Sequence, residues 1–326
     1  MHGLELTVGT AAVKHWRRRA RGLGSRCMRR AKRRIAAPGR GAEPRPRRAL
    51  ALGILLGGLS TMGLAPAPGC DNAPDEVVAP VTITPAEEPG PQREPPVEAL
   101  RVHVLREYPH DKDAFTQGLL WHDGAIYEST GQYGESSLRK VRLDDGKVLA
   151  ERAIDPGLFA EGLALVDGRL IQLTWRAGLA LVSDLETLEQ RKTLRYRGEG
   201  WGLCYDGSFL VMSDGSSILE FRDPASLEVI REVTVTKNGR AVPRLNELEC
   251  VGADVYANIW RSDEILRIDA RTGRVTASID ASGLLTRLES IRADVLNGIA
   301  YKPDSKTFLI TGKLWPHLFE VELVPR

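Results

Sequence analysis

The sequence predicts an all-β protein whose folded part is a five-bladed β-propeller. A short phrase recurs five times between residues 117 and 299, with spacings of 44, 40, 45 and 51 residues. The five copies are Gln117-Gly118-Leu119, Glu161-Gly162-Leu163, Trp201-Gly202-Leu203, Asn246-Glu247-Leu248 and Asn297-Gly298-Ile299. A repeat of about forty residues, built from short apolar runs and glycine turns, is typical of one four-stranded blade.

Each of the first three repeats opens with a predicted hairpin. Two apolar runs flank an Asp-Gly pair at 123–124, at 167–168 and at 206–207. This arrangement indicates a tight turn, because glycine adopts the positive φ angles that such turns need. Two outer strands are expected to follow in each blade, for example 138–143 with 148–154, or 265–269 with 275–279.

The last repeat offers only three predicted strands, near 299–301, 307–310 and 318–323. We expect residues 100–105, which precede the first repeat, to supply its fourth strand. A ring closed by an N-terminal strand that joins the last blade leaves no open sheet edge.

The composition of the first 97 residues differs from that of the repeats. Residues 1–48 form a basic leader with fifteen Lys or Arg against two acids, so the net charge of +2 hides a leader of +13 and a remainder of −11. Basic runs can bind nucleic acid. Here they precede an apolar segment, residues 49–70, and that order is typical of an export signal. We therefore expect an exported protein that does not bind nucleic acid.

Cys70 ends this signal-like segment. The apolar run 49–65 is short for a transmembrane span, and a small residue, Gly69, stands directly before the cysteine. This pattern resembles a bacterial lipoprotein cleavage site, which would make Cys70 a lipidated residue in the periplasm or cell envelope. Simple cleavage and secretion is the alternative.

Two further segments complete the predicted organisation. Residues 71–97 are rich in proline and acids, which predicts a disordered linker. Residues 98–326 are predicted to be a single, monomeric catalytic domain. An oxidising compartment would allow Cys204 and Cys250 to form a disulfide, but we favour two buried free thiols on inner strands.

The repeats predict a central site. Equivalent positions in a propeller lie at similar heights around its axis, so the first residues of the five copies should converge. A second layer lies fourteen positions further on, or sixteen in the fifth repeat, and consists of Gly131, Trp175, Gly215, Trp260 and Lys313. Phe115 and Phe159 each stand two residues before a first-layer residue. An apolar pocket with a few convergent polar groups is the usual form of a small-molecule site.

Glu161 is the strongest candidate for chemistry. A carboxylate placed among aromatic side chains is costly to bury, and desolvation should raise its pKa. A carboxyl group with a raised pKa suits proton transfer near neutral pH. The alternative is a structural ion pair between Glu161 and Lys313.

The segments around these residues resemble a known family. They are 115–118 (Phe-Thr-Gln-Gly), 159–162 (Phe-Ala-Glu-Gly), 172–175 (Gln-Leu-Thr-Trp), 200–202 (Gly-Trp-Gly), 246–249 (Asn-Glu-Leu-Glu), 257–260 (Ala-Asn-Ile-Trp), 297–298 (Asn-Gly) and 312–315 (Gly-Lys-Leu-Trp). Together they are similar to the plant and bacterial glutaminyl-peptide cyclotransferases. The resemblance covers about residues 100–325, and it implies a five-bladed propeller that converts an N-terminal glutamine of peptides or proteins to pyroglutamate and releases ammonia.

The resemblance also implies roles for individual residues. Glu161 would be the catalytic acid and base, with Lys313 and Asn246 beside it. The substrate would be bound by Phe115, Gln117, Phe159, Trp175, Trp201, Trp260 and Asn297. Lys313, Asn246 or Gln117 could donate to the developing oxyanion, and the sequence does not choose among them.

Two other functions remain open at this stage. A propeller lactonase would hold a divalent metal with Glu161, Asn246 and Asn297, although six blades would be expected there. A non-enzymatic surface propeller would bind peptide or sugar and would not need Glu161. We expect no catalytic cofactor, and no zinc-ligand spacing is present in the sequence. A structural calcium ion on the axis is an additional expectation.

Overall fold

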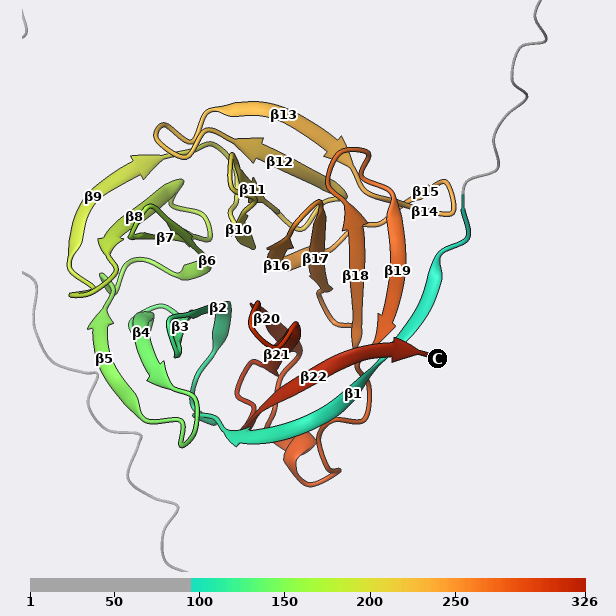
Figure 1. The fold of residues 1–326 in the computed structure, drawn as a ribbon. Coiled ribbons are helices and arrows are strands. Elements are labelled where there is room, and N and C mark those ends of the chain that lie inside the picture. The colour runs from blue at the N-terminus through green and yellow to red at the C-terminus, as the bar shows by residue number, and fades with distance from the viewer. Residues whose placement is uncertain (1–94) are drawn as a thin grey trace, which may run out of the picture. The chain divides into compact units, whose positions relative to one another are not determined.

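The computed structural model describes residues 95–326, and this part of the chain consists almost wholly of β-strands (Figure 1). Twenty-two strands and one short 3-10 helix, η1 (Glu289–Ile291), are assigned within these residues. The fold class predicted from the repeats is therefore confirmed as all-β. The predicted leader, the signal-like segment with Cys70 and all but the last residues of the linker lie outside the described residues.

Three sheets each contain four antiparallel strands in sequence order. The first comprises β2 (Thr116–His122), β3 (Ala125–Thr130), β4 (Ser137–Arg142) and β5 (Val148–Ala153). The second comprises β6 (Ala160–Val166), β7 (Arg169–Thr174), β8 (Leu179–Asp184) and β9 (Gln190–Arg195). The third comprises β10 (Leu203–Tyr205), β11 (Leu210–Met212), β12 (Ile218–Arg222) and β13 (Val229–Thr234). A small hairpin, β14 (Thr236–Lys237) with β15 (Arg240–Ala241), follows the third sheet.

The remaining strands form one eight-stranded sheet. Its first half is β16 (Leu245–Val251), β17 (Asp254–Ile259), β18 (Glu264–Asp269) and β19 (Val275–Asp280). Its second half is β20 (Leu296–Lys302), β21 (Thr307–Gly312), β22 (His317–Pro325) and β1 (Glu98–Pro109). The antiparallel pairing of β1 with β22 confirms that the N-terminal strand completes the last set of strands. The sequence did not predict that β1 also pairs in parallel with β19, which joins the two halves.

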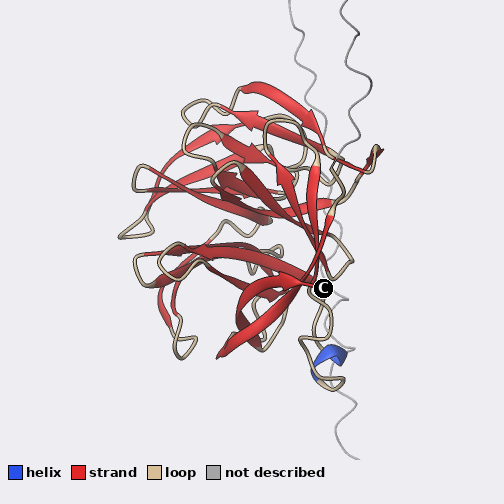
Figure 2. Cartoon of the chain, turned by 45° about the vertical axis from the view of Figure 1, so that its right-hand side comes forward, coloured by secondary structure: helices blue, strands red, loops and turns tan. Residues whose placement is uncertain are grey.

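The first strands of the five sets lie innermost in Figure 1 and contact one another in the order β2, β6, β10, β16, β20 and back to β2. Figure 2 shows the sheets from another side, with η1 protruding from the body that the strands form. The five repeated phrases lie on these inner strands or, for Trp201, just before one. Residues far apart in the chain are therefore brought to one centre.

Glycine in the repeated phrase permits this close approach of the inner strands. A Cβ atom on Gly162 would lie 2.5 Å from the amide nitrogen of Leu203, and one on Gly202 would lie 2.0 Å from the carbonyl oxygen of Asn246. Any larger side chain would push the neighbouring strand away. The phrase is thus a packing element as well as the position of the first layer.

The predicted Asp-Gly turns are of two kinds. Asp123-Gly124 has φ angles of 46° and 76°, and Asp167-Gly168 has φ angles of 47° and 73°, as expected for a two-residue hairpin turn. The turn at Asp206 is longer, since the last paired residues on either side of it are Tyr205 and Leu210. Its carboxylate accepts hydrogen bonds from the amides of Ser208 and Phe209. The hairpin predicted there exists, but its geometry differs.

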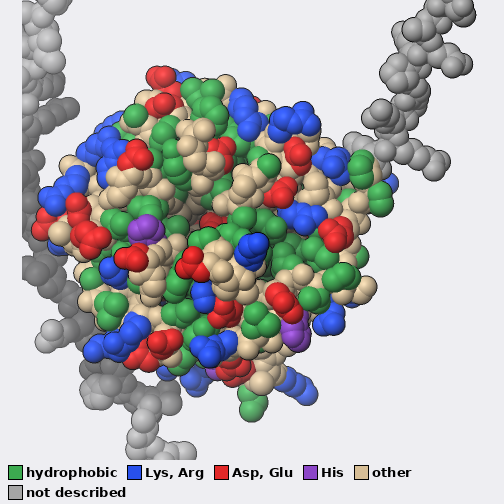
Figure 3. Space-filling view, viewed as in Figure 1, with side chains coloured by type: hydrophobic (Ala, Val, Ile, Leu, Met, Phe, Trp, Pro, Cys, Tyr) green, Lys and Arg blue, Asp and Glu red, His purple; other side chains and the backbone are tan. Residues whose placement is uncertain are grey.

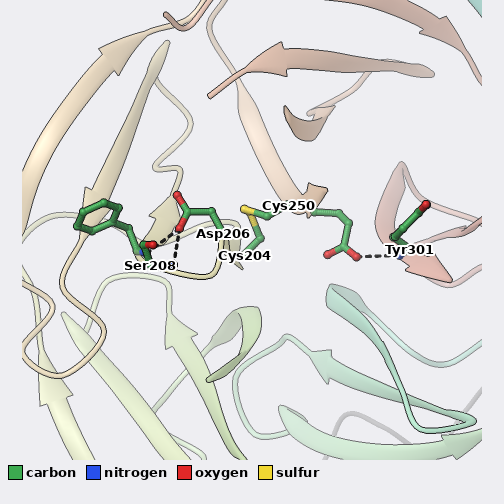
Figure 4. The surroundings of a disulfide bond; sticks show 7 residues. Cys204, Asp206, Ser208, Cys250 and Tyr301 are labelled. Carbon is green, nitrogen blue, oxygen red and sulfur yellow. Dashed lines mark hydrogen bonds between the residues drawn. A yellow bond between two sulfur atoms is a disulfide. The ribbon is translucent and has the colours of Figure 1, made fainter. Parts of the chain in front are cut away.

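The predicted free thiols are wrong: Cys204 and Cys250 form a disulfide (Figure 4). Their Cα atoms are 5.5 Å apart, on the adjacent inner strands β10 and β16. The contact between these strands brings together two cysteines that are 46 positions apart in the chain. This proximity depends on sheet-to-sheet packing, which the strand pattern alone does not specify.

Candidate functional site

The central site, defined as the ten residues predicted to bind or react with substrate, is built at irregularities of the inner strands. The pairing register shifts at Gln117 in β2, at 161–162 in β6, at 246–247 in β16 and at 297–298 in β20. In each case the inner strand has one residue more than its partner. A bulge of this kind turns a side chain out of the regular alternation of a strand. Each of the four polar first-layer residues therefore lies at a β-bulge.

Main-chain hydrogen bonds connect the two predicted layers in four of the five repeats. In each repeat, the amide of the second-layer residue donates to the carbonyl group of the residue two positions before the first-layer residue. The pairs are Gly131 to Phe115, Trp175 to Phe159, Trp260 to Arg244 and Lys313 to Val295, at 2.8–2.9 Å. The fifth repeat follows this pattern despite its two-residue insertion. The third repeat differs, since the amide of Trp201 donates to Ser213 instead.

Aromatic side chains of the central site form two groups. The ring centroids of Phe115 and Phe159 are 6.1 Å apart, and those of Phe159 and Trp175 are 5.6 Å apart. Trp201 and Trp260 form a second edge-to-face pair at 5.7 Å. Each of these pairs has the edge-to-face geometry that aromatic quadrupoles favour.

Glu199 joins the two aromatic groups through hydrogen bonds, and the repeats did not predict this residue as part of the site. Its Oε2 atom accepts hydrogen bonds from Nε1 of Trp175 at 2.8 Å and from Nε1 of Trp201 at 3.2 Å. A signal was present, because Glu199 stands two residues before a first-layer residue, as Phe115 and Phe159 do. The role of the carboxylate was hidden because one of its partners comes from the preceding sheet.

Glu161 is buried without a partner for its carboxylate. The residue is 5% exposed, and neither of its carboxylate oxygens accepts a hydrogen bond from the described residues. These oxygens are also not among the polar atoms that are sealed from solvent and lack partners. Burial raises the pKa of Glu161 well above its usual value; the charge of Lys313 opposes this and the charge of Glu199 adds to it. The carboxyl group is therefore accessible and readily protonated.

Lys313 is the buried cation of the site. It is 5% exposed, and its Nζ atom lies 4.8 Å from the centroid of the Phe115 ring. Burial lowers the pKa of Lys313, while the charges of Glu161 and Asp294 raise it. Among the described residues, no ion pair within 4.0 Å joins Lys313 to Glu161. The two groups influence each other without direct contact, which leaves both available to a ligand.

Three amide side chains form an oriented relay. Asn297 Nδ2 donates to the carbonyl oxygen of Thr116 at 2.9 Å and to Oε1 of Gln117 at 3.3 Å, and its Oδ1 accepts from Nδ2 of Asn246 at 2.7 Å. The backbone carbonyl can only accept, so it fixes the orientation of Asn297 and, through it, of the other two amides. Asn246 Oδ1 and Gln117 Nε2 make no hydrogen bond to the described part of the chain and are not sealed from solvent.

The structure thus brings all ten predicted residues into one connected region. Aromatic contacts link Phe115, Phe159 and Trp175, Glu199 links Trp175 to Trp201 and Trp260, and the amide relay lies on the same inner strands. Figure 3, which views the same face as Figure 1, shows a hollow near the centre of the ring. No group of three or more His, Cys, Asp or Glu residues arranged to hold a metal ion occurs within residues 95–326.

Comparisons with known proteins agree with one another. A family model described as glutamine cyclotransferase matches residues 77–323. A glutaminyl-peptide cyclotransferase of Arabidopsis thaliana is 43% identical over 227 residues, which cover 68% of this chain and 71% of that protein. The crystal structure of Myxococcus xanthus glutaminyl cyclase is similar with a TM-score of 0.65 and 43% identity, covering 71% of this chain and 99% of that one.

Proposed function

The chain belongs to the glutamine cyclotransferase family, and we propose that the central site around Glu161 carries out the reaction of that family. The protein is a glutaminyl-peptide cyclotransferase that closes an N-terminal glutamine of a peptide into pyroglutamate and releases ammonia. The observation that carries the assignment of the site is the buried carboxylate of Glu161, which has no hydrogen-bond partner in the part of the chain that the structure describes and is reached by solvent.

Substrate binding uses the walls of the site. The methylene groups of the substrate glutamine pack between Trp175, Trp201 and Trp260, with Phe115 and Phe159 alongside. The reacting amine and carboxamide belong to the same residue, so the site has only to hold the chain in a bent conformation in which they meet. Rigid aromatic walls suit this purpose, because they exclude extended conformations of the side chain.

The oriented amides recognise the carboxamide. Gln117 Nε2 offers donors to the substrate carbonyl oxygen, and Asn246 Oδ1 accepts from the substrate amide nitrogen. Asn297 positions both, since its own polar atoms are committed within the relay. A carboxylate in place of the carboxamide would face the Asn246 oxygen with a second acceptor, which favours glutamine over glutamate.

Glu161 transfers the proton. The lone pair of the α-amine attacks Cδ of the carboxamide, and the Glu161 carboxylate accepts a proton from the amine as the new C–N bond forms. The tetrahedral intermediate then expels its original amide nitrogen, which receives this proton from Glu161 and leaves as ammonia. The raised pKa of Glu161 brings its basicity closer to that of the amine.

Lys313 and Gln117 stabilise the oxyanion of the tetrahedral intermediate. Lys313 supplies positive charge within a buried environment, where such a charge acts strongly. Asn246 is the weaker candidate, since its Nδ2 atom already donates to Asn297.

The architecture that supports this site is, we propose, a five-bladed propeller formed by residues 98–326. Three blades are the four-stranded sheets, and the eight-stranded sheet supplies two more, β16–β19 and β20–β22 with β1. The cyclic contact order of the five innermost strands supports this division. We further propose that this domain acts as a monomer and without a catalytic cofactor; an axial calcium ion would be structural.

The proposed location is outside the cytoplasm. The disulfide between Cys204 and Cys250 suits an oxidising compartment, as does the signal-like segment 49–70. No helix in residues 95–326 is long and apolar enough to cross a membrane. Lipidation of Cys70 would attach the protein to the envelope, and a mass increase of the mature N-terminal peptide that is lost in Cys70→Ala would test it.

The decisive experiment measures ammonia release from a Gln-initiated dipeptide by the purified protein, with and without EDTA. We expect ammonia and a pyroglutamyl product under both conditions, and a loss of roughly 10²–10⁴-fold in rate in Glu161→Gln. A near wild-type rate in this folded variant would overturn the role of Glu161. Activity on lactones that depends on an added metal would instead favour a propeller lactonase, and binding without turnover would favour a surface propeller.

A further inference from the structure

Glu199 uses both carboxylate oxygens at the border of the central site. Its Oε2 accepts from the two indole N–H groups of Trp175 and Trp201, and its Oε1 accepts from Nε of Arg176 at 2.9 Å. The two tryptophans come from different sheets of the ring. One carboxylate therefore sets the planes of two indoles, at a point where a hydrogen bond from the amide of Gly200 to the carbonyl oxygen of Trp175 already joins the two backbones.

Arg176 reinforces this arrangement. Its guanidinium carbon lies 3.8 Å from the centroid of the Trp175 ring, so the cation covers the outer face of the indole whose edge Glu199 holds. The side chains of Arg176 and Glu199 are 60% and 37% exposed, respectively. These side chains are therefore partly exposed to solvent, and burial alone does not immobilise them.

Glu199 also acts on Glu161 through its charge. Partial burial raises the pKa of Glu199, but hydrogen bonds from Trp201, Arg176 and Trp175 outweigh this, and the pKa is lowered overall. The resulting anion raises the pKa of Glu161. The other groups that interact electrostatically with Glu161 are Lys313, which lowers its pKa, and the neutral phenol of Tyr196.

We propose that Glu199 is a positioning residue of the cyclotransferase, which holds the indoles of Trp175 and Trp201 against the substrate and presents its negative charge to the same site. The inference rests on the role proposed for Glu161. It assigns two separable effects to one side chain, one on substrate binding and one on proton transfer.

Two variants separate these effects. Glu199→Gln keeps an oxygen that can accept from both indoles and removes the charge. Glu199→Ala removes the acceptor and the charge together. The matched control is Glu189→Gln, because Glu189 is an exposed acid that is ion-paired with Arg191 at 3.0 Å on the outer part of the second sheet.

The measurements are kcat and KM for a Gln-initiated dipeptide as a function of pH, together with tryptophan fluorescence. In Glu199→Gln we expect an unchanged KM and an acidic limb of kcat/KM that moves to lower pH, because Glu161 loses a neighbouring anion. In Glu199→Ala we expect the same shift, a rise in KM of roughly tenfold or more and altered tryptophan emission. Glu189→Gln should match the wild type in all three measurements.

An unshifted acidic limb in Glu199→Gln would overturn the electrostatic part of the proposal. A wild-type KM and wild-type tryptophan emission in Glu199→Ala would overturn the proposed positioning of the two indoles. If Glu199→Ala fails to fold, Glu199→Gln still tests whether the charge of Glu199 acts on Glu161. A parallel assay of Glu161→Gln distinguishes a failure of the role proposed for Glu161 from a failure of the role proposed for Glu199. If that variant is active, the proposed role of Glu161 fails; if it is inactive while both Glu199 variants behave as wild type, only the present inference fails.

Discussion

Two buried glutamates in neighbouring sheets have opposite environments. Glu161 has no hydrogen-bond partner for its carboxylate within residues 95–326, and burial raises its pKa. Glu128, 1% exposed, accepts hydrogen bonds from His110, Thr116 and Arg139, at 3.1, 2.6 and 2.6 Å. Burial raises the pKa of Glu128 too, but the charges and hydrogen bonds of its partners bring it down to about 2.

The difference shows that one fold can hold the same side chain in two opposite electrostatic environments. At Glu128 the partners compensate for desolvation, so the carboxylate is a fixed anion in a network that ties the 110–116 segment to β3 and β4. Glu161 has no such hydrogen-bond partners among the described residues, so its carboxyl group can exchange a proton. A buried acid without partners costs stability, and such groups are typical of functional sites.

The largest expected effect comes from exchanging the two glutamates for glutamine. Glu128→Gln leaves the buried Arg139 and His110 without their shared anion, and we expect a loss of about 3–5 kcal/mol in the free energy of unfolding. Glu161→Gln should cause no comparable loss, because among the described residues its carboxylate makes no hydrogen bond and no ion pair within 4.0 Å, and only its longer-range attraction to Lys313 is removed. Urea denaturation of both variants checks this, and equal destabilisation would remove the distinction between the sites.

The disulfide is a stabilising contact outside the central site. The double variant Cys204→Ser/Cys250→Ser removes the disulfide that joins β10 to β16, and we expect a loss of about 2–4 kcal/mol. Activity per folded molecule should stay at the wild-type level, as no site residue is altered. A fall in kcat at a temperature where the variant is fully folded would show that the disulfide also shapes the site.

The smallest effect is the pH dependence of the Glu128 contribution. A lowered pKa means that this contribution is complete above the ordinary value of 4.5 and is lost as the pH falls towards about 2. The pKa of His110 is raised, despite burial, by the charge and hydrogen bond of Glu128, so its contribution is complete below the ordinary value of 6.5 and declines as the pH rises past the raised value. The stability difference between wild type and Glu128→Gln should therefore be greatest between pH 4.5 and 6.5. A difference independent of pH would contradict the ionic description.

Much of the site could be predicted because residues at equivalent positions of the repeat come together in the fold. Residues at equal places in the repeat, such as Glu161 and Asn246, converge once the inner strands form a ring. Contacts between different repeats have no such period. Glu199 with Trp175, and Cys204 with Cys250, are examples, and so is the parallel pairing of β1 with β19. The partners of Glu128 were hidden for a different reason: Arg139 lies in the same sheet, but it meets Glu128 only through the pairing register of β3 with β4, which the repeat does not specify.

The pairing of β1 with β22 has a consequence for the order of folding. Tyr108 in β1 donates to Glu320 in β22, across 212 positions of the chain. The ring therefore cannot close until the last strand has been synthesised, whereas each four-stranded sheet consists of neighbouring segments and can assemble earlier. Contacts between distant segments form slowly, so closure by β1 and β22 is expected to be the late step in the maturation of this enzyme.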